Sequence, residues 1–380
     1  MRPERILVVD DDASMLRTVV RVLRSHYAVV GAGSGREALE ILEEEQPDLA
    51  VLDVRMPAMN GFELLARLRE RRPDLDVIFM TGLVHELDAS LIRSIRERAF
   101  FFIQKPFERE LLLALVERCL DQRRLARENK AYVEQLEGEL AEARAFQEGL
   151  LPAMQARTNG FEVAGWWAPC DRLGGDFFDH ASVGAQSLGV LMADASGHGV
   201  SAAMTTAAVK SAFHDARDEA LDPLVVARRI LGCVAGFELD RFVTAFCGRL
   251  DGARRVLRYV NGGHPAGFLL SADGRLRELE PTGPFFSPVF DAQSFETGSW
   301  EVREVELAPG DRLLLFTDGL SEARGPEELF GEARLREAFR THGAAGPSAE
   351  ALGAIERAVR EFTGGRPQDD DRTMLCVSCP

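Results

Sequence analysis

The first 118 residues alternate short apolar runs with amphipathic stretches. The apolar runs are the predicted strands 6–9, 28–30, 49–52, 77–80 and 100–103. Between them, segments such as 34–45 and 61–70 carry apolar residues at helical spacing. Strands that alternate with helices are typical of a doubly wound parallel sheet. We therefore expect an α/β domain over residues 1–118.

Residues 111–150 contain almost no turn signal and predict one long helix. The apolar positions at three- and four-residue steps are Val133, Leu136, Leu140, Ala143 and Leu150. This heptad spacing favours a dimeric coiled coil, in which Gln147 would be a polar seam residue that sets the register. The alternative is a helix that lies along one of the domains. Proline disfavours helix at the preceding residue, so Leu151-Pro152 should end a linker that spans 119–152.

From residue 153 to residue 380 the predicted order is strands, helices, strands, helices and a last strand. The turn pairs that separate apolar runs, and so predict hairpins, are Asp251-Gly252, Asp273-Gly274 and Pro309-Gly310. Predicted helices cover 200–217, 223–236 and 348–362. This order favours an α+β domain built on antiparallel sheets.

Composition narrows the function classes. The chain has 380 residues, a hydrophobic fraction of 46% and a formal net charge of -16. An acidic chain is a poor candidate for non-specific nucleic-acid binding. No apolar run approaches the roughly 18 residues of a membrane span, and residues 1–5 do not resemble a signal peptide. Six scattered cysteines form no disulfide framework, so we expect a reducing cytoplasm and no membrane partner.

Polar residues follow the predicted strands of the first domain where function is expected in such a sheet. Asp10 and Asp11 follow the first strand, and Asp53 ends the third. Thr81 ends the fourth strand, and Lys105 follows the fifth. Each alone could be a helix cap or a solvated charge. Together, three carboxylates suit one Mg²⁺, a hydroxyl and an ammonium suit phosphoryl oxygens, and Asp53 suits a nucleophile.

These segments resemble the receiver domain of two-component response regulators. The matching runs are 6–12 (ILVVDDD), 52–57 (LDVRMP), 80–82 (MTG) and 104–107 (QKPF). The resemblance implies that Asp10, Asp11 and Asp53 hold Mg²⁺ and that a sensor histidine kinase phosphorylates Asp53. It also implies that Thr81 and Lys105 sense the phosphoryl group. The switch aromatic maps to Phe102, and Arg98-Ala99 stands where the family usually has Gly-Ala.

Four aspartates in glycine-rich settings mark the second site. They are Asp176, Asp194, Asp318 and Asp370. Carboxylates at strand ends suit hard divalent cations, and a pair of such cations suits phosphate ester hydrolysis. Singly, each could be an ordinary turn or an acidic loop. His198 lies just before the predicted helix 200–217 and close to Asp194 in sequence, where it could be a general acid or a rim residue.

These segments resemble the SpoIIE branch of metal-dependent Ser/Thr protein phosphatases (PPM). The matching runs are 146–152 (FQEGLLP), 174–179 (GGDFFD), 194–199 (DASGHG), 261–265 (NGGHP), 317–319 (TDG) and 370–373 (DDRT). The resemblance implies a β-sandwich flanked by helices that holds two Mn²⁺ or Mg²⁺. Asp194 would bridge both metals, and the Ala195 carbonyl would join one of them. Asp318 and Asp370 would complete the other, and Asp176 would act directly or through water; a one-residue shift within 369–371 stays open.

The combined resemblance implies a response regulator with a phosphatase output. Its substrate would be a phosphorylated anti-sigma-factor antagonist or a similar regulator, and the active form would be a homodimer. A non-enzymatic adaptor is the alternative, and the acidic balance argues against a third class, a DNA-binding regulator. Segment 282–290 departs from the branch pattern, and its phenylalanines would be either core or a docking surface. His264 is expected to be structural.

Overall fold

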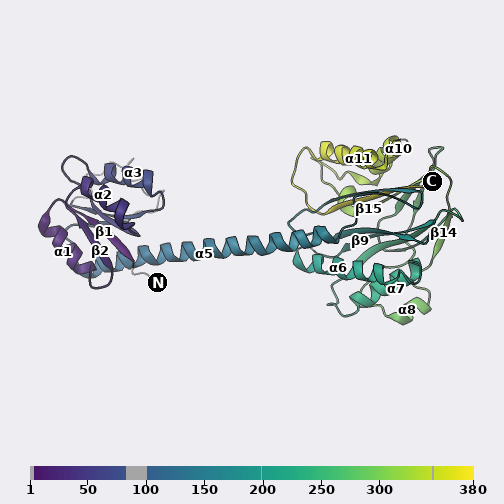
Figure 1. Cartoon of the computed structure of the whole chain (residues 1–380), viewed down its shortest axis with the longest axis horizontal. Helices are drawn as coiled ribbons and strands as arrows, with labels where there is room; N and C mark the ends of the chain where they lie inside the picture. Colours follow the sequence, from purple (N-terminus) through teal and green to yellow (C-terminus); the bar gives the residue numbers. More distant parts are fainter. Residues whose placement is uncertain (1–3, 83–100, 198, 345) are drawn as a thin grey trace. The chain divides into compact units, whose positions relative to one another are not determined.

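The computed structural model describes residues 4–82, 101–197, 199–344 and 346–380. The chain divides into two compact units, Met1–Leu136 and Glu137–Pro380, and the division falls within helix α5 (Arg109–Leu150). The α/β unit, the long helix and the α+β unit expected from the sequence are all confirmed (Figure 1). No helix in these described ranges combines the length and apolar character needed to cross a membrane.

The N-terminal unit is a parallel sheet in the order β2-β1-β3-β4-β5. Its strands are β1 (Arg5–Val9), β2 (Ala28–Ala32), β3 (Leu49–Asp53), β4 (Asp76–Thr81) and β5 (Phe101–Gln104). The helices described between them are α1 (Ala13–Leu23), α2 (Gly35–Glu45) and α3 (Gly61–Arg71). Each of the three helices begins after a side chain that caps its amide groups, namely Asp12, Ser34 or Asn60.

Both faces of this sheet are buried, as the continuous apolar runs of its strands require. In β1, Leu7 and Val9 belong to one hydrophobic cluster, and Ile6 and Val8 belong to the cluster on the other face. Because these strands run parallel, the carboxyl ends of β1, β3 and β4 meet at one edge of the sheet, where the predicted phosphorylation site lies.

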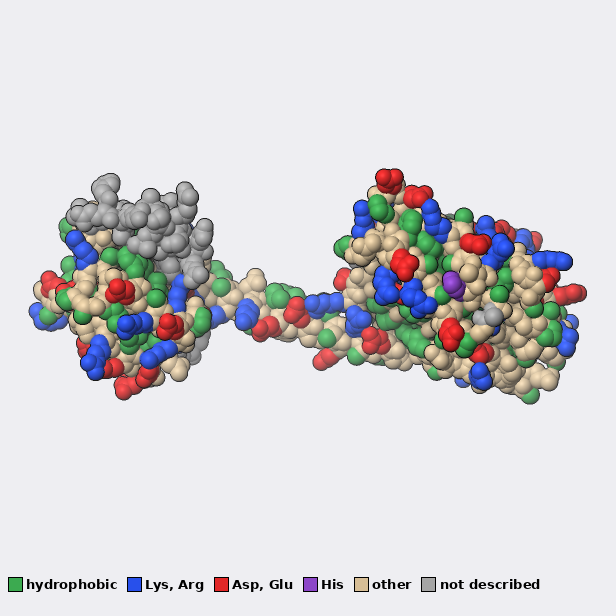
Figure 2. All heavy atoms as spheres, turned by 90° about the horizontal axis from the view of Figure 1, so that it is seen from above, with side chains coloured by type: hydrophobic (Ala, Val, Ile, Leu, Met, Phe, Trp, Pro, Cys, Tyr) green, Lys and Arg blue, Asp and Glu red, His purple; other side chains and the backbone are tan. Residues whose placement is uncertain are grey.

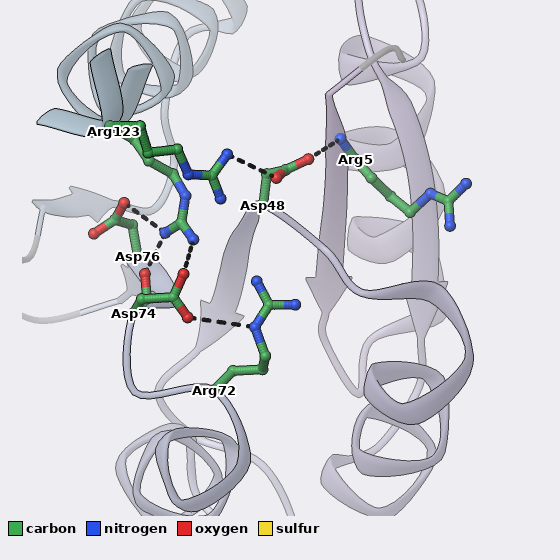
Figure 3. A network of polar contacts seen from close by, with 7 residues as sticks. Arg5, Asp48, Arg72, Asp74, Asp76 and Arg123 are labelled. Carbon is green, nitrogen blue, oxygen red and sulfur yellow. Dashed lines mark hydrogen bonds and ion pairs between the residues drawn. The ribbon is translucent and has the colours of Figure 1, made fainter. Parts of the chain in front are cut away.

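Helix α5 begins on the N-terminal unit. Leu112 and Val116 are fully buried against one face of the sheet. Two turns later a polar network continues the contact (Figure 3): Arg123 forms ion pairs with Asp74 at 2.6 Å and Asp76 at 3.0 Å. Asp74 and Asp76 lie at the start of β4, so the network holds the helix at the sheet edge opposite the predicted phosphorylation site.

The C-terminal unit is a sandwich of two antiparallel sheets covered by helices. One sheet has the order β14-β11-β10-β9-β8, and the other has the order β13-β12-β15-β16-β7-β6. Helices α6 (Val200–Asp215) and α7 (Pro223–Val234) cover the first sheet, and α10 (Gly331–Gly343) and α11 (Ser348–Thr363) cover the second (Figure 1). A third hydrophobic cluster fills the space between the sheets.

The strands of the sandwich are mostly short, and they agree with the predicted order. They are β6 (Gln155–Thr158), β7 (Phe161–Ala168), β8 (Asp176–Val183), β9 (Ser187–Ala195), β10 (Val243–Asp251), β11 (Val256–Gly262), β12 (Gly267–Leu270), β13 (Leu276–Leu279), β14 (Arg303–Glu306), β15 (Arg312–Phe316) and β16 (Arg372–Ser378). Two short helices complete the unit, α8 (Ala292–Glu296) and α9 (Asp318–Ser321).

One predicted hairpin is wrong. Asp251-Gly252 and Asp273-Gly274 do join paired strands, β10 with β11 and β12 with β13. Pro309-Gly310 instead lies between β14, which pairs with β11, and β15, which pairs with β12 and β16. A Pro-Gly pair predicts a turn but not its strand partners, and here the chain crosses from one sheet to the other.

Candidate active sites

The predicted phosphorylation site of the N-terminal unit forms at the carboxyl edge of its sheet. Asp10 and Asp53 are buried, with 1% and 7% of their surfaces exposed, and Asp11 is exposed. Lys105 Nζ donates to Asp10 Oδ2 and to Asp53 Oδ1, each at 2.7 Å. Thr81, at the end of β4, is buried, and its carbonyl accepts from the Lys105 amide at 2.7 Å. The structure thus brings together all five residues expected there.

The electrostatics of this site favour a cation. Burial raises the pKa of Asp10, and the hydrogen bond from Lys105 offsets only part of that effect. Burial alone would lower the pKa of Lys105, but its bonds to Asp10 and Asp53 outweigh burial and raise it. Oxygens of Asp10, Asp11 and Asp53 lie within 4.8 Å of one another, as one hard divalent ion requires.

The expected switch aromatic lies on the neighbouring strand. Phe102 of β5 is half-buried and stacks on the buried Phe79 of β4, with the ring centroids 5.4 Å apart. The ring of Phe102 therefore packs against the hydrophobic cluster on one face of the sheet. The Arg98-Ala99 departure noted in the sequence lies outside the described residues.

Two of the expected metal aspartates of the C-terminal unit face each other across a strand pair. Asp176 opens β8 and is directly opposite Asp194 near the end of β9. Asp176 is 3% exposed, and its Oδ2 accepts a hydrogen bond from the Thr317 hydroxyl at 2.6 Å. Thr317 precedes Asp318, so this bond joins the third aspartate motif to the first. The contact connects residues that are 141 positions apart.

The acidic run at 369–371 separates into three environments. Asp371 is buried and accepts from the amides of Cys170 at 2.7 Å and Gly175 at 2.6 Å. Asp369 forms an exposed ion pair with Arg324 at 3.4 Å. Asp370 is exposed, with one oxygen accepting from the Asp371 amide at 2.8 Å. Asp371 therefore holds the loop before Asp176, a role that sequence reasoning missed.

Crowded carboxylates raise one another's pKa values in this site. For Asp194, burial and then the charges of Asp318, Asp370 and Asp371 raise the pKa to about 7. For Asp176, burial and then the charge of Asp194 raise the pKa well above its ordinary value. Divalent cations would relieve this repulsion, so the donor set fits metal. These aspartates lie farther apart than Asp10, Asp11 and Asp53 of the N-terminal unit. Among the described residues, only those three form an acidic cluster of three or more whose ligand atoms all lie within 4.8 Å of one another.

Two glycines let the backbone close around these aspartates. A Cβ at Gly175 would lie 2.4 Å from the Ala195 carbonyl oxygen, and one at Gly319 would lie 2.0 Å from the Asp371 carbonyl oxygen. Such distances are far below van der Waals contact, so any larger residue would push the motifs apart. The Ala195 carbonyl, expected to bind metal, therefore lies against the loop that carries Asp176.

Gln147 has a different role from the one expected. It is 2% exposed and lies in the C-terminal unit, so it cannot be a polar residue in a dimer seam. Its Nε2 donates to the Gly174 carbonyl at 2.6 Å, and its Oε1 accepts from the Gly174 amide at 3.2 Å. The end of α5 therefore binds the loop that positions Asp176. Only the tertiary contact reveals this, because Gln147 and Gly174 are 27 residues apart.

The two candidate histidines differ in outcome. His198 lies outside the described residues. His264 is 1% exposed, and its Nδ1 is 2.8 Å from the Thr244 hydroxyl. Burial lowers the pKa of His264 to about 3, and a contact with the Phe316 backbone offsets only part of the effect. This histidine is neutral and packed inside the sandwich, as expected for a structural residue.

Known proteins share parts of this architecture. The chain is 25% identical to Protein IcfG of Synechocystis sp. over 282 residues, covering 67% of this chain and 43% of that protein. It is 38% identical to the DNA-binding transcriptional regulator NtrC of Escherichia coli over 122 residues, covering 30% of this chain and 24% of that protein. The chain spans less than half the length of these curated relatives.

A solved structure supports the fold of the C-terminal unit. The SiaA-PP2C domain of Pseudomonas aeruginosa matches with a TM-score of 0.56 and 24% identity, covering 66% of this chain and 99% of that chain. Residues 6–117 match the response regulator receiver domain. Residues 184–380, more than half of the chain, match Stage II sporulation protein E (SpoIIE). The chain therefore belongs to the SpoIIE family of PPM phosphatases and carries a response regulator receiver domain at its N-terminal end.

Proposed function

We propose that this chain is a response regulator in which phosphorylation of Asp53 controls a metal-dependent phosphoserine and phosphothreonine phosphatase. The observation that carries the proposal is the convergence of motifs around Asp176 in the C-terminal unit. Asp194 faces it across the strand pair, Thr317 bonds its carboxylate, and Asp371 holds its loop. These contacts draw carboxylates from distant parts of the sequence into one region, which supports a site for divalent cations.

In the phosphatase domain, Asp194 and the Ala195 carbonyl would hold metal together with Asp318 and Asp370, and Asp176 would act directly or through water. This assignment follows the family resemblance, and the occupied bonds of Asp369 and Asp371 favour Asp370 within the acidic run. Two bound Mn²⁺ or Mg²⁺ ions would supply an activated water and neutralise phosphoryl oxygens. Hydrolysis would release the serine or threonine hydroxyl and inorganic phosphate.

In the receiver, Asp10, Asp11 and Asp53 would hold Mg²⁺. An Asp53 oxygen would attack the phosphorus of a phosphohistidine on a sensor histidine kinase, and the nitrogen–phosphorus bond would break as the acyl phosphate forms. Lys105 contacts both buried carboxylates at 2.7 Å, so its ammonium can turn to the new phosphoryl oxygens. Thr81 and Phe102 would then report the modification.

The signal would reach the phosphatase through α5. This helix is anchored by Arg123 in the receiver, and Gln147 near its other end bonds both backbone groups of Gly174. A shift or rotation of α5 would therefore move the loop that positions Asp176. We infer that phosphorylation activates the enzyme by favouring the arrangement in which Gln147 is hydrogen-bonded to Gly174.

The exposed middle of α5 would dimerise the protein. Val133 and Leu136 are 45% and 39% exposed at heptad positions of α5, and Leu140 is half-buried. Leu150, the last residue of the expected seam, instead packs against the core of the C-terminal unit. In this proposal residues 1–118 are the receiver, 119–152 the coiled-coil linker and 153–380 the phosphatase. By family resemblance, the substrate is a phosphorylated anti-sigma-factor antagonist in a partner-switching pathway.

A hydrolysis assay distinguishes an active phosphatase from a non-enzymatic adaptor. Its substrates are p-nitrophenyl phosphate and a phosphoserine protein, each with Mn²⁺ or Mg²⁺. We expect turnover that stops with a chelator, and a loss of about 10²-fold or more in Asp194→Ala. Asp369→Ala is the matched control, because its exposed carboxylate is paired with Arg324, and it should retain activity. Chelator-resistant turnover, or an active Asp194→Ala protein, would reject the two-metal proposal.

A further inference from the structure

Two aromatic side chains remain partly exposed beside the metal-binding motif. Phe242 is 36% exposed and Phe285 is 43% exposed. Their ring centroids are 4.8 Å apart, and the rings are tilted by 45°. On the face drawn in Figure 2, acidic, basic and apolar side chains are interspersed on the C-terminal unit. A contacting pair of exposed aromatic rings is a feature more typical of a binding surface than of an ordinary exterior.

Hydrogen bonds connect this pair directly to the Asp194 motif. The Ser196 amide donates to the Phe242 carbonyl at 2.9 Å, and the Phe242 amide donates to Ser196 Oγ at 2.9 Å. Ser196 is two residues from Asp194 along the chain. The backbone of Phe242 is therefore fixed beside the proposed metal centre, because it extends the pairing of β10 with β9, the strand that carries Asp194.

Phe285 is held on a rigid base. Its neighbour Phe286 is fully buried and exchanges two backbone hydrogen bonds with Val243, both at 2.8 Å. The Phe286 ring stacks on the buried Trp300, with centroids 5.4 Å apart and an interplanar angle of 12°. The phenylalanine segment is thus both core and surface, because adjacent residues point in opposite directions. An ordered exposed ring loses little conformational entropy when it binds a partner.

A cation completes the surface. The Arg241 guanidinium lies 3.5 Å from the Ser196 carbonyl and close to Gly197, where a Cβ would lie 3.3 Å from Arg241 Nη1. Within the described ranges, no carboxylate lies within 4.0 Å of this guanidinium. Arg241 donates one long hydrogen bond to the Ser196 carbonyl and pairs with no described carboxylate, so its guanidinium is available to an anionic group from outside.

We propose that Arg241, Phe242 and Phe285 form the docking surface for the phosphorylated segment of a protein substrate. The two rings take an apolar side chain next to the phosphorylated residue, and Arg241 takes a carboxylate of the same segment. The phosphoryl group itself belongs to the metal ions, which leaves the guanidinium for a second anion. This inference rests on the proposed phosphatase function and adds what the enzyme selects in its substrate.

Synthetic phosphoserine peptides test the surface. One peptide carries leucine on both sides of the phosphoserine and an aspartate nearby; the second replaces the leucines by serine, and the third replaces the aspartate by asparagine. Burial of one leucine side chain corresponds to roughly a tenfold preference or more in kcat/KM. In wild type we expect kcat/KM to be higher by this factor for the first peptide than for the second. In the double variant Phe242→Ser, Phe285→Ser, the ratio of the two kcat/KM values should fall toward one. Arg241→Ala should lose the preference for aspartate, and added salt should weaken that preference in wild type.

Matched controls separate docking from catalysis and from folding. Leu329→Ser removes an exposed apolar side chain elsewhere in the domain, and Arg254→Ala removes an exposed cation at the far end of the β10–β11 hairpin. Both should keep the wild-type preferences. Equal losses on the peptides and on p-nitrophenyl phosphate would overturn a docking role, as would wild-type preferences near one. If no form hydrolyses p-nitrophenyl phosphate, the phosphatase proposal fails. The docking surface is then tested separately by fluorescence anisotropy of the labelled peptides with the metal-loaded chain: weaker binding of the first peptide in the double phenylalanine variant supports it, and unchanged binding overturns it.

Discussion

Replacing Gln147 by alanine should uncouple the linker helix from the catalytic loop. The side chain of Gln147 is hydrogen-bonded to both the backbone carbonyl and the backbone amide of Gly174, at 2.6 and 3.2 Å. Its Nε2 also lies 3.4 Å from the Thr206 hydroxyl. Gly174 is two residues before Asp176, whose carboxylate Thr317 already holds. The substitution therefore removes one of the supports of this loop and leaves the aspartates unchanged.

The structure sets the size of the effect. A buried polar group that loses its partner costs about 1–3 kcal/mol, and Gly174 loses partners for two groups. Since each 1.4 kcal/mol is about a factor of ten, we expect the bonded loop arrangement to lose at least tenfold in population. Gln147→Glu should be worse, because a carboxylate would face the Gly174 carbonyl and add charge near Asp176.

The assay is turnover of p-nitrophenyl phosphate against Mn²⁺ concentration. For Gln147→Ala we expect a kcat about tenfold lower or a higher Mn²⁺ requirement, with the protein still folded. Gln122→Ala is the matched control, because that glutamine is exposed on the same helix. A Gln147→Ala protein with wild-type kcat and metal requirement would refute the reasoning that α5 acts through this contact.

Two further predictions concern assembly and stability. Leu136→Glu plus Leu140→Glu should convert a dimer into a monomer in light scattering, because charges would enter the heptad seam; a wild type that is monomeric at micromolar concentration would contradict the coiled coil. His264 has a pKa lowered to about 3 by burial, so its contribution to stability is complete above its unfolded pKa of about 6.5 and is lost as the pH falls below that value. Between pH 7 and pH 5 the free energy of unfolding of the metal-loaded phosphatase domain should fall by about 2 kcal/mol more in wild type than in His264→Asn. The three tryptophans all lie in this domain, so their fluorescence reports its unfolding, and equal slopes for the two proteins would contradict a neutral buried histidine.

Much of the receiver site follows from the sequence because its geometry is local. Each of Asp10, Asp53 and Thr81 lies at the end of a parallel strand or directly after it, and parallel strands end at one edge of their sheet. The strand periodicity thus predicts both the fold and the proximity of the side chains. Lys105 follows the same rule after β5.

The phosphatase site depends on contacts that periodicity does not contain. Asp371 binds the amide of Gly175 across 196 residues, and Gln147 binds Gly174 across 27 residues. At the sequence level, Gln147 occupied a heptad position, which favoured a dimer seam over burial in the domain. In segment 282–290, composition could not show that Phe286 points into the core while Phe285 points outward. Such choices are made by packing between distant elements.

The coupling between the two domains is the central claim, and one comparison tests it most directly. The kcat/KM for p-nitrophenyl phosphate is measured at saturating Mn²⁺ with and without beryllofluoride, a stable mimic of the phosphoryl group, in wild type and in Asp53→Asn. A coupling free energy of about 1–3 kcal/mol corresponds to a change of roughly 5–150-fold. The account predicts activation in that range for wild type and none for Asp53→Asn, which also reports any direct effect of the mimic on the metal centre. Equal activity in all four conditions would contradict control of the phosphatase by the receiver.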